Sequence, residues 1–470
     1  MSGKRRNVLH AKIDTVVTAR FLIAAAHKSS GKTVISTGLA AAFVAAGQKL
    51  QTFKKGPDYI DPMWLASASA RPCYNLDFNT MDADELLALF ADRSADADLA
   101  MIEANKGLFD GVDLDGSDSN AAMAKLIGAP VILVIDTNGM TRGIAPLLQG
   151  YQAFDPAVNI AGVILNKVGG ARHESKLRAA VAAYCDIPVI GAVWRNRALE
   201  IGERHLGLTT PAETGELAGT IAEIGRIIGG SVDLSALAAI ADTAEKMAKP
   251  MRLQTPTSPA DLRIGIARDT AFGFYYPDDL DAFAKAGARL IPIDTLSDAV
   301  LPGLDGLFIG GGFPETQMPA LAANVSLRTN IRQAIENGLP TYAECGGLMY
   351  LCERMIWNGD RREMVGVIPG DAVMCAKPQG RGYARFTNSP AHPWATPGKS
   401  VKAHEFHYAR LENLKPGLAF GRAIERGAGI DGHYDAIVIH NLVAGFCHLR
   451  STRDNPWVKN FVDFVRSKKA

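Results

Sequence analysis

Continuous apolar runs alternate with segments of helical spacing in the first half of the chain. The helical segments include residues 32–46 and 120–127. Because buried strands that alternate with helices form a parallel sheet covered on both faces, this pattern predicts an α/β fold. The runs expected to form its strands are residues 21–26, 50–54, 99–103, 131–136, 160–166 and 188–193.

A second alternation of the same kind begins at residue 263. Helix-like sequence at 213–248 precedes it, followed by a polar, proline-containing stretch that is typical of a linker. We therefore expect an N-terminal extension at 1–20, an α/β domain at 21–248, a linker at 249–262 and a second α/β domain at 263–470. The expected strands of the second domain are residues 263–269, 289–293, 306–310, 340–344, 381–386, 404–411 and 436–440.

The composition is that of an ordinary globular protein, and it narrows the range of partners. The chain has 470 residues, a formal net charge of +1 and 47% hydrophobic residues. This balance gives no general attraction to nucleic acid, and no apolar run reaches the roughly 18 residues of a membrane-spanning helix. The N-terminus lacks a secretory signal, and the six cysteines show no CxxC or metal-type spacing. We expect a cytoplasmic protein without a membrane or nucleic-acid partner.

One cysteine has a distinctive setting. Cys345 ends an apolar run and is followed by two glycines and a helix-like segment, where helix N–H groups favour a thiolate. Gly311 and Gly312 end another apolar strand. Their backbone N–H groups, with that of Gly346, are expected to form an oxyanion hole beside the thiol.

Two histidines are candidate bases for this cysteine. His448 follows a third apolar run and is the expected base, while His440 also ends an apolar strand and is the main alternative. In this order, the glycine-rich turn, the cysteine and the late histidine resemble a class I glutamine amidotransferase domain. Such a domain releases ammonia from L-glutamine through a cysteine thioester.

Residues 26–33 read Ala-His-Lys-Ser-Ser-Gly-Lys-Thr and lie between a predicted strand and a predicted helix. They match the phosphate-binding P-loop pattern, except that Ala26 replaces its first glycine. Backbone N–H groups of such a loop surround phosphates, the lysine neutralises their charge, and the threonine hydroxyl holds Mg²⁺. The residues expected to bind ATP and Mg²⁺ here are His27, Lys28, Ser29, Ser30, Gly31, Lys32 and Thr33.

Charged residues gather after the second predicted strand, in the segment Lys-Lys-Gly-Pro-Asp-Tyr-Ile-Asp-Pro at 54–62. Open α/β folds bind their ligands at the carboxyl ends of parallel strands. We therefore expect Asp58, Tyr59 and Asp61 to face the substrate, and Asp58 also to bind the metal. The alternative is a charged surface turn.

Two later strand ends also carry candidate ligands. Glu103 ends the third strand, where a carboxylate reaches Mg²⁺ directly or through water. Lys106 and Asp110 follow it, and we expect them near the transferred phosphate or the substrate. Asn166 ends a later strand, where contact with the nucleotide base is expected.

Taken together, these motifs resemble the a,c-diamide synthases, which act on tetrapyrroles of cobalamin biosynthesis and on related macrocycles. The resemblance spans residues 21–450. It implies a P-loop domain, similar to dethiobiotin synthetase, that uses ATP–Mg²⁺ to convert a tetrapyrrole carboxylate into an acyl phosphate. Ammonia from the glutaminase domain then displaces the phosphate. The segments that carry the resemblance are 27–33, 56–62, 103–111, 310–315, 342–348, 404–408 and 448–450.

The resemblance leaves open which tetrapyrrole accepts the ammonia. The segment Glu-Ala-Asn-Lys-Gly-Leu-Phe-Asp-Gly at 103–111 is similar to the version in the siroheme-amidating relative, and residues 377–383 point the same way. We therefore expect siroheme or sirohydrochlorin as the polycarboxylate tetrapyrrole, with cobyrinic or hydrogenobyrinic acid as the alternative. The size of such a substrate favours a homodimer. His448-Leu449-Arg450 lacks the glutamate of the usual His-x-Glu pattern, so the group that orients His448 is unassigned.

Two further interpretations of the function stay open. A P-loop ATPase switch of the partitioning kind would carry a signature lysine five residues before the P-loop lysine, but His27 stands there. A glutaminase domain would also be superfluous in such a protein. The other reading is a glutamine-dependent synthetase with a different acceptor, similar to cobyric acid synthase or cytidine triphosphate synthase.

Overall fold

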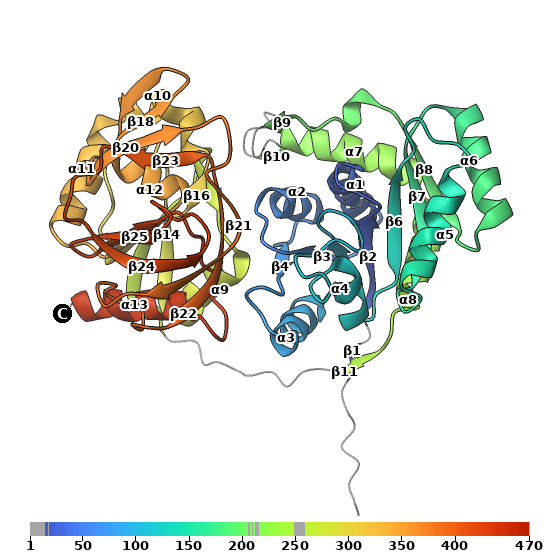
Figure 1. Cartoon of the computed structure of the whole chain (residues 1–470), viewed down its shortest axis with the longest axis horizontal. Helices are drawn as coiled ribbons and strands as arrows, with labels where there is room; N and C mark the ends of the chain where they lie inside the picture. The colour runs from blue at the N-terminus through green and yellow to red at the C-terminus, as the bar shows by residue number, and fades with distance from the viewer. Residues whose placement is uncertain are drawn as a thin grey trace, which may run out of the picture.

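The chain forms two lobes in the computed structural model, each built around its own central sheet (Figure 1). The structure describes residues 15–16, 18–204, 207–208, 210–211, 216–248 and 259–469. Most of the expected N-terminal extension and residues 249–258 of the expected linker lie outside these ranges. The α/β fold predicted for both halves is confirmed.

A seven-stranded parallel sheet forms the centre of the N-terminal lobe, in the order β4-β3-β5-β2-β6-β7-β8. Because β3, β5 and β2 are neighbours, the three loops that leave their carboxyl ends meet at one edge. The strands are β2 (Ala19–Ala25), β3 (Leu50–Lys55), β4 (Tyr74–Leu76), β5 (Leu99–Glu103), β6 (Val131–Asp136), β7 (Ile160–Val168) and β8 (Val189–Trp194).

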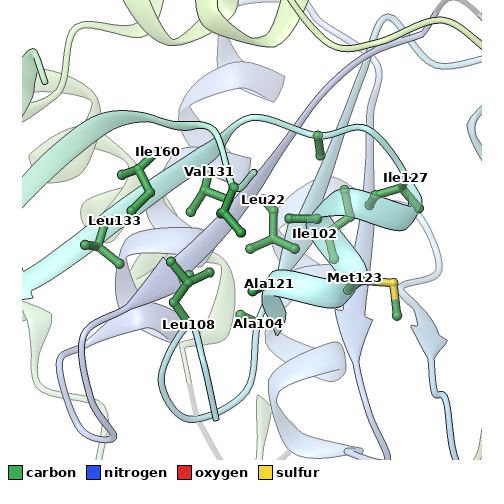
Figure 2. Close-up of a cluster of buried hydrophobic side chains, with 14 of the residues drawn as sticks. Leu22, Ile102, Ala104, Leu108, Ala121, Met123, Ile127, Val131, Leu133 and Ile160 are labelled. Carbon is green, nitrogen blue, oxygen red and sulfur yellow. The ribbon is translucent and has the colours of Figure 1, made fainter. Parts of the chain in front are cut away.

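Helices cover both faces of this sheet. Along β2, Leu22 and Ala24 pack on one face while Phe21 and Ile23 pack on the other, which explains why the strand is apolar throughout. Figure 2 shows part of the first of these cores, which contains Leu22 and Met123. That core includes α3 (Ala83–Ser94), α4 (Asn120–Leu126), α5 (Ile144–Phe154) and α6 (Ala171–Tyr184), and the other includes α1 (Lys32–Ala45), α2 (Ile60–Ser69), α7 (Leu217–Ser231) and α8 (Leu234–Asp242).

The helix-like stretch at 213–248 is two helices rather than one. The chain becomes extended between α7 and α8, and the Asp233 carboxylate accepts the backbone N–H of Ala236 and so caps α8. The stretch ends in β11 (Met247–Ala248), which pairs with β1 (Thr15–Val16). A second short pair joins β9 (Glu203–Arg204) to β10 (Gly207–Leu208).

A nine-stranded mixed sheet forms the centre of the C-terminal lobe, in the order β14-β12-β15-β17-β26-β25-β24-β21-β22. The first five strands are parallel, and the remaining pairings are antiparallel. The strands are β12 (Leu262–Ala267), β14 (Ala288–Ile293), β15 (Gly306–Ile309), β17 (Thr341–Glu344), β21 (Gly380–Asn388), β22 (Ser400–His407), β24 (Ala419–Arg426), β25 (Tyr434–Ile439) and β26 (Leu442–Gly445).

Smaller elements complete this lobe. A four-stranded sheet contains β18 (Cys352–Trp357), β19 (Asp360–Glu363), β20 (Ile368–Met374) and β23 (Ala409–Glu412), and β13 (Phe272–Phe274) pairs with β16 (Gly311–Gly312). The helices are α9 (Pro277–Lys285), α10 (Met318–Ala323), α11 (Val325–Glu336), α12 (Gly346–Leu351) and α13 (Trp457–Lys468).

The strand predicted at 404–411 is wrong as a single element. The chain changes partner at Tyr408: β22 pairs with β21 in the large sheet, whereas β23 pairs with β20 in the small one. Both halves carry the same alternation of side chains, so the sequence pattern does not reveal the change of sheet.

The two lobes meet along α2, β4 and α3, which face the C-terminal lobe in Figure 1. Asp281 on α9 accepts hydrogen bonds from Tyr74 at 3.1 Å and from Arg93 at 2.5 Å. Buried apolar side chains also cross the interface, since Tyr59 packs in one cluster with Phe274 and Tyr276. Among the described residues, no helix is long and apolar enough to span a membrane.

Candidate active sites of the two lobes

Cys345 lies in a tight turn between β17 and α12. Its φ of +50° and ψ of −104° are unusual for an L-residue, and backbone strain of this kind is concentrated at functional sites. The Cys345 N–H donates to the Gly445 carbonyl at 2.8 Å, which ties the turn to β26. A Cβ on Gly347 would lie 2.2 Å from the Ile309 carbonyl oxygen, so the glycine lets α12 pack directly on β15.

The three glycines expected in the oxyanion hole lie around this turn. A Cβ on Gly346 would lie 3.2 Å from the Gly312 nitrogen, and one on Gly311 would lie 2.7 Å from His448 Cε1. The glycine-rich turn, the nucleophile and the base therefore share one site. Side chains at these positions would clash with their neighbours, so the glycines allow the close packing around the thiol.

His448, the candidate base, lies beside Cys345 in the fold. It is 2% exposed, and its ring interacts electrostatically with the side chain of Cys345. Burial by itself lowers the pKa of His448, but Cys345 and the Glu344 carboxylate outweigh it and raise this pKa to about 10. A cysteine beside a histidine that gains a proton in this way is the arrangement that activates a thiol nucleophile.

Glu344 is the candidate for the orienting group that the sequence alone did not assign. Its Oε2 lies 3.5 Å from His448 Nδ1, and its Oε1 accepts the Leu449 N–H at 2.8 Å and the Tyr342 hydroxyl at 2.6 Å. The sequence did carry one signal for Glu344, because this carboxylate directly precedes the cysteine at the end of a buried strand. The Leu449 N–H and the Tyr342 hydroxyl hold the carboxylate in place.

His440 is excluded as the base by strand direction. It lies exposed in the turn that precedes β26, whereas Cys345 lies beyond the other end of the paired strand β17. The register pairs Glu344 with Gly445, so the carboxyl end of β26 is the end near the nucleophile. His404 is the histidine that stacks on His448, with ring centroids 4.9 Å apart.

The predicted P-loop wraps the start of α1 at the carboxyl end of β2. Gly31 has a φ of +87°, and a Cβ there would lie 2.3 Å from Asn166 Nδ2. The Asn166 amide donates to the Ser30 carbonyl at 2.8 Å, so in this structure Asn166 supports the loop. The same loop exposes His27, Lys28 and Ser29 to solvent.

Lys32 and the loop that follows β5 meet above the P-loop. Lys32 Nζ donates to the Lys106 carbonyl at 2.6 Å, while the Lys106 side chain is exposed. Burial and the nearby Lys54 ammonium lower the pKa of Lys32 to about 8. Asp110 accepts the Gly107 N–H at 2.8 Å, so it closes its own loop at the rim of the site.

A buried lysine joins the carboxylates of this lobe. Lys54 Nζ lies 2.6 Å from Glu103 Oε1, 2.5 Å from Asp61 Oδ2 and 3.8 Å from Asp58 Oδ2. Although burial opposes its charge, Asp61 and Glu103 hold the pKa of Lys54 well above its usual range. The sequence showed Lys54 without assigning it a role; its place at the end of a fully buried strand was the signal.

Thr33 and Glu103 are suited to Mg²⁺. The Thr33 hydroxyl donates to Glu103 Oε1 at 3.2 Å, and Glu103 Oε2 is buried without a hydrogen-bond partner among the described residues. Mg²⁺ prefers oxygen ligands and keeps several from phosphates and water. This fits the finding that no three His, Cys, Asp or Glu of the described ranges form a metal cluster by themselves. Asp58 instead accepts the N–H groups of Ile60 and Asp61 at the start of α2.

Tyr59 is placed differently from the expectation that it faces the substrate of its own lobe. It crosses into the other lobe, where its hydroxyl lies 3.3 Å from His448 Nδ1. Its ring stacks on Phe274 with centroids 5.1 Å apart and an interplanar angle of 1°. Tyr59 reaches the glutaminase site because the two lobes pack against each other there.

Two family descriptions match the two lobes. Residues 21–208 match the CobQ/CobB/MinD/ParA nucleotide binding domain, and residues 263–456 match the CobB/CobQ-like glutamine amidotransferase domain. The first description includes partitioning ATPases, but the second domain separates this chain from them. The nucleotide-binding and glutaminase assignments of the two halves are therefore confirmed.

Relatives along nearly the whole chain carry the name cobyrinate a,c-diamide synthase. The protein from Magnetococcus marinus is 43% identical over 96% of this chain and 97% of its own length. Those from Methanosarcina acetivorans and Dehalococcoides mccartyi are 38% and 37% identical, over 92% and 94% of this chain and 92% and 97% of their own lengths. These names favour the corrin alternative and lend no support to the siroheme hypothesis. The chain belongs to the cobyrinate a,c-diamide synthase family and is a glutamine-dependent amidoligase.

Proposed function

We propose that this protein amidates the a and c acetate carboxylates of a corrin, cobyrinic or hydrogenobyrinic acid, at the expense of ATP and L-glutamine. The observation that carries the proposal is the contact between the two sites: the segment after β3 belongs to the P-loop lobe and touches the catalytic histidine. An amidotransferase needs this proximity, because ammonia released into water is protonated and lost. The substrate class follows from the names of the relatives.

In the glutaminase lobe, Cys345 attacks the carboxamide carbon of glutamine. As the C–S bond forms, negative charge moves to the carboxamide oxygen, which the N–H groups of the oxyanion glycines stabilise. His448 gives its proton to the departing nitrogen, and the C–N bond breaks to release ammonia. His448 then takes a proton from water, which hydrolyses the thioester to glutamate and restores the thiolate.

In the P-loop lobe, ATP supplies the phosphoryl group that turns an acceptor carboxylate into an acyl phosphate. Lys32 neutralises phosphate charge, and Thr33 with Glu103 would hold Mg²⁺, which supplies further neutralisation. Lys54 holds Glu103 and Asp61 in place. Asp58, Asp61, Lys106 and Asp110 are proposed to contact the acceptor and its reacting carboxylate. Ammonia then attacks the acyl carbon, the amide forms and phosphate leaves.

Amidation of a panel of macrocycles tests the proposal. The purified protein is incubated with ATP, Mg²⁺ and glutamine, and each product is read by mass spectrometry as the replacement of hydroxyl by amino groups. The panel contains cobyrinic acid, hydrogenobyrinic acid, siroheme and sirohydrochlorin. We expect two amides on a corrin and none on the other two. Conversion of siroheme alone would overturn the corrin assignment, and conversion of no macrocycle would reopen the acceptor.

A further inference from the structure

A cavity of about 130 Å³ lies in the C-terminal lobe, apart from both candidate sites. The connection between β21 and β22, the strand β24 and the start of α13 contribute to its lining, whereas Cys345, His448 and the P-loop do not. Its volume is several times that of a water molecule. The cavity therefore has room for a small ligand, and the side chains around it indicate which kind.

Three nitrogen atoms of the lining residues are buried hydrogen-bond donors without a partner in the described part of the chain. They are Arg422 Nε, Trp394 Nε1 and Asn455 Nδ2. Arg422 is only 1% exposed, so its guanidinium does not reach bulk water. A buried donor that stays unpaired is costly, and none of these three atoms can act as an acceptor. A ligand that brings oxygen acceptors would therefore satisfy the lining.

The charges around the cavity favour a negative ligand. Arg422 and Lys399 are among the lining residues, and no Asp or Glu of the described ranges is. Arg422 donates from its other two nitrogens to Asp435 and to the Tyr342 hydroxyl, at 3.2 Å each. Asp435 also accepts two backbone N–H groups just after β26, so its carboxylate is engaged within the sheet. Nε is therefore the edge of the guanidinium that remains for an anion.

The start of α13 adds to this preference. The helix is 12 residues long, and its cap residue Pro456 provides no side-chain hydrogen bond to the first turn. Pro456 and Asn460 both line the cavity. Free N–H groups and the dipole of a helix favour negative charge at its N-terminus. The helix end and the buried donors therefore favour the same kind of ligand.

We propose that this cavity is a binding site for a small oxyanion, a phosphate or a carboxylate. The oxygens of the anion accept from Arg422, Trp394 and Asn455, and its charge lies at the start of α13. The Trp394 ring is already held by an edge-on contact with His392, with ring centroids 4.4 Å apart. The site goes beyond the function proposed above and does not depend on it. Phosphate and glutamate, which the proposed reaction releases, both carry this chemistry, so the test includes each.

Calorimetric titration of the full-length protein with inorganic phosphate, glutamate or acetate at constant ionic strength tests the proposal. ADP and Mg²⁺ are present throughout to fill the P-loop. We expect saturable binding at one site per chain. Phosphate binding alone would identify a phosphate ligand, and binding of glutamate and acetate would identify a carboxylate.

Two variants locate the bound anion. Asn455→Asp places a carboxylate in the cavity with little change of size, and Trp394→Phe keeps an aromatic ring but removes one donor. Each should weaken anion binding by about 10-fold or more, since one hydrogen bond to a charged group is lost. Asn358→Asp is the matched control, because it adds the same charge in the exposed turn between β18 and β19 and should bind the anion like the wild type.

Two results would overturn the inference. A wild type that binds none of the three anions would show that the cavity holds only water. Unchanged affinity in Asn455→Asp and Trp394→Phe proteins that melt like the wild type would place the anion elsewhere, and if one variant fails to fold, the other decides. Loss of amidation with intact anion binding would instead refute only the proposed function.

Discussion

One carboxylate lies beside the candidate catalytic histidine. Glu344 directly precedes Cys345, and its two oxygens reach His448 and the backbone of Leu449. The nucleophile, the base and the orienting group therefore come from two strand ends that hydrogen-bond to each other. This compact arrangement replaces the His-x-Glu pattern, because the acid reaches the base from the neighbouring strand.

Replacing Glu344 by Gln should disable the glutaminase and spare the synthetase. The amide keeps the size of the side chain but cannot stabilise the imidazolium, so kcat for glutamine hydrolysis should fall by about 10²-fold or more. Ammonium chloride should still support amidation of the acceptor at the wild-type rate, since it bypasses Cys345. Steady-state assays with each nitrogen source check this. Equal losses with both sources would place Glu344 in a purely structural role.

Replacing Cys345 by Ala should lower the pKa of His448. Cys345, ahead of Glu344, raises that pKa against the effect of burial, from 6.5 to about 10, so without Cys345 burial counts for more and the imidazole loses its proton at lower pH. In the wild type, the protonated His448 stabilises the fold fully below pH 6.5, and this contribution fades as the pH rises toward 10. Histidine NMR titration of both proteins measures the shift. A pKa that does not move would contradict the interaction between Cys345 and His448.

At the scale of elements, close backbone contacts decide where reactive groups point. The turn at Cys345 is possible because α12 approaches β15 without a side chain between them at Gly347. In the other lobe, Gly31 allows the P-loop to pass over Asn166 in the same way. Glycines at these two positions are part of the sites although they carry no chemistry.

Gly347→Ala should destabilise the C-terminal lobe. A Cβ there would lie 2.2 Å from the Ile309 carbonyl oxygen, and overpacking of this kind costs about 1–3 kcal/mol. Glutaminase activity should fall as the turn at Cys345 shifts. Gly230→Ala is the control, because nothing lies within 4 Å of its added Cβ at the end of α7; there alanine should be neutral or slightly stabilising. Urea denaturation compares the two, and equal midpoints would refute the argument.

At the scale of the whole molecule, the interface between the lobes links the two candidate sites. Arg450 is 3% exposed, pairs with Asp278 at 2.9 Å, and donates across the interface to the Asn75 carbonyl. Asn75 in turn holds the segment that carries Tyr59. The contacts between the lobes therefore connect the phosphate site to the glutaminase site. The homodimer expected from the sequence stays a prediction, which light scattering of the purified protein tests.

Arg450→Met should uncouple the two halves. Losing the contact with Asn75 should weaken the interface between the lobes. More than one glutamate should then form for each amide, and calorimetry should resolve two unfolding transitions instead of one. Arg466→Met is the control, since Arg466 forms an exposed ion pair with Asp261 inside the C-terminal lobe. If Arg450→Met forms one glutamate for each amide and unfolds in a single transition, the interface between the lobes does not depend on this arginine.

Much of the architecture was predictable because strand and helix periods are local. The strands at 99–103 and 131–136 match β5 and β6 to the residue, since both are apolar runs buried on two faces. The three-residue β4 was missed because its run is too short to stand out, and 404–411 was misread because a change of partner strand leaves no periodic mark.

The sequence by itself determined the chemistry and its order along the chain. The P-loop, the cysteine before two glycines and the late histidine are local motifs, so their identity is readable from spacing alone. Only the tertiary structure decided which side chains meet: Glu344 rather than another acid lies beside His448, Asn166 supports the P-loop, and Tyr59 leaves its own lobe. These contacts depend on strand register and on packing between lobes, which join residues hundreds of positions apart and so leave no pattern in the sequence.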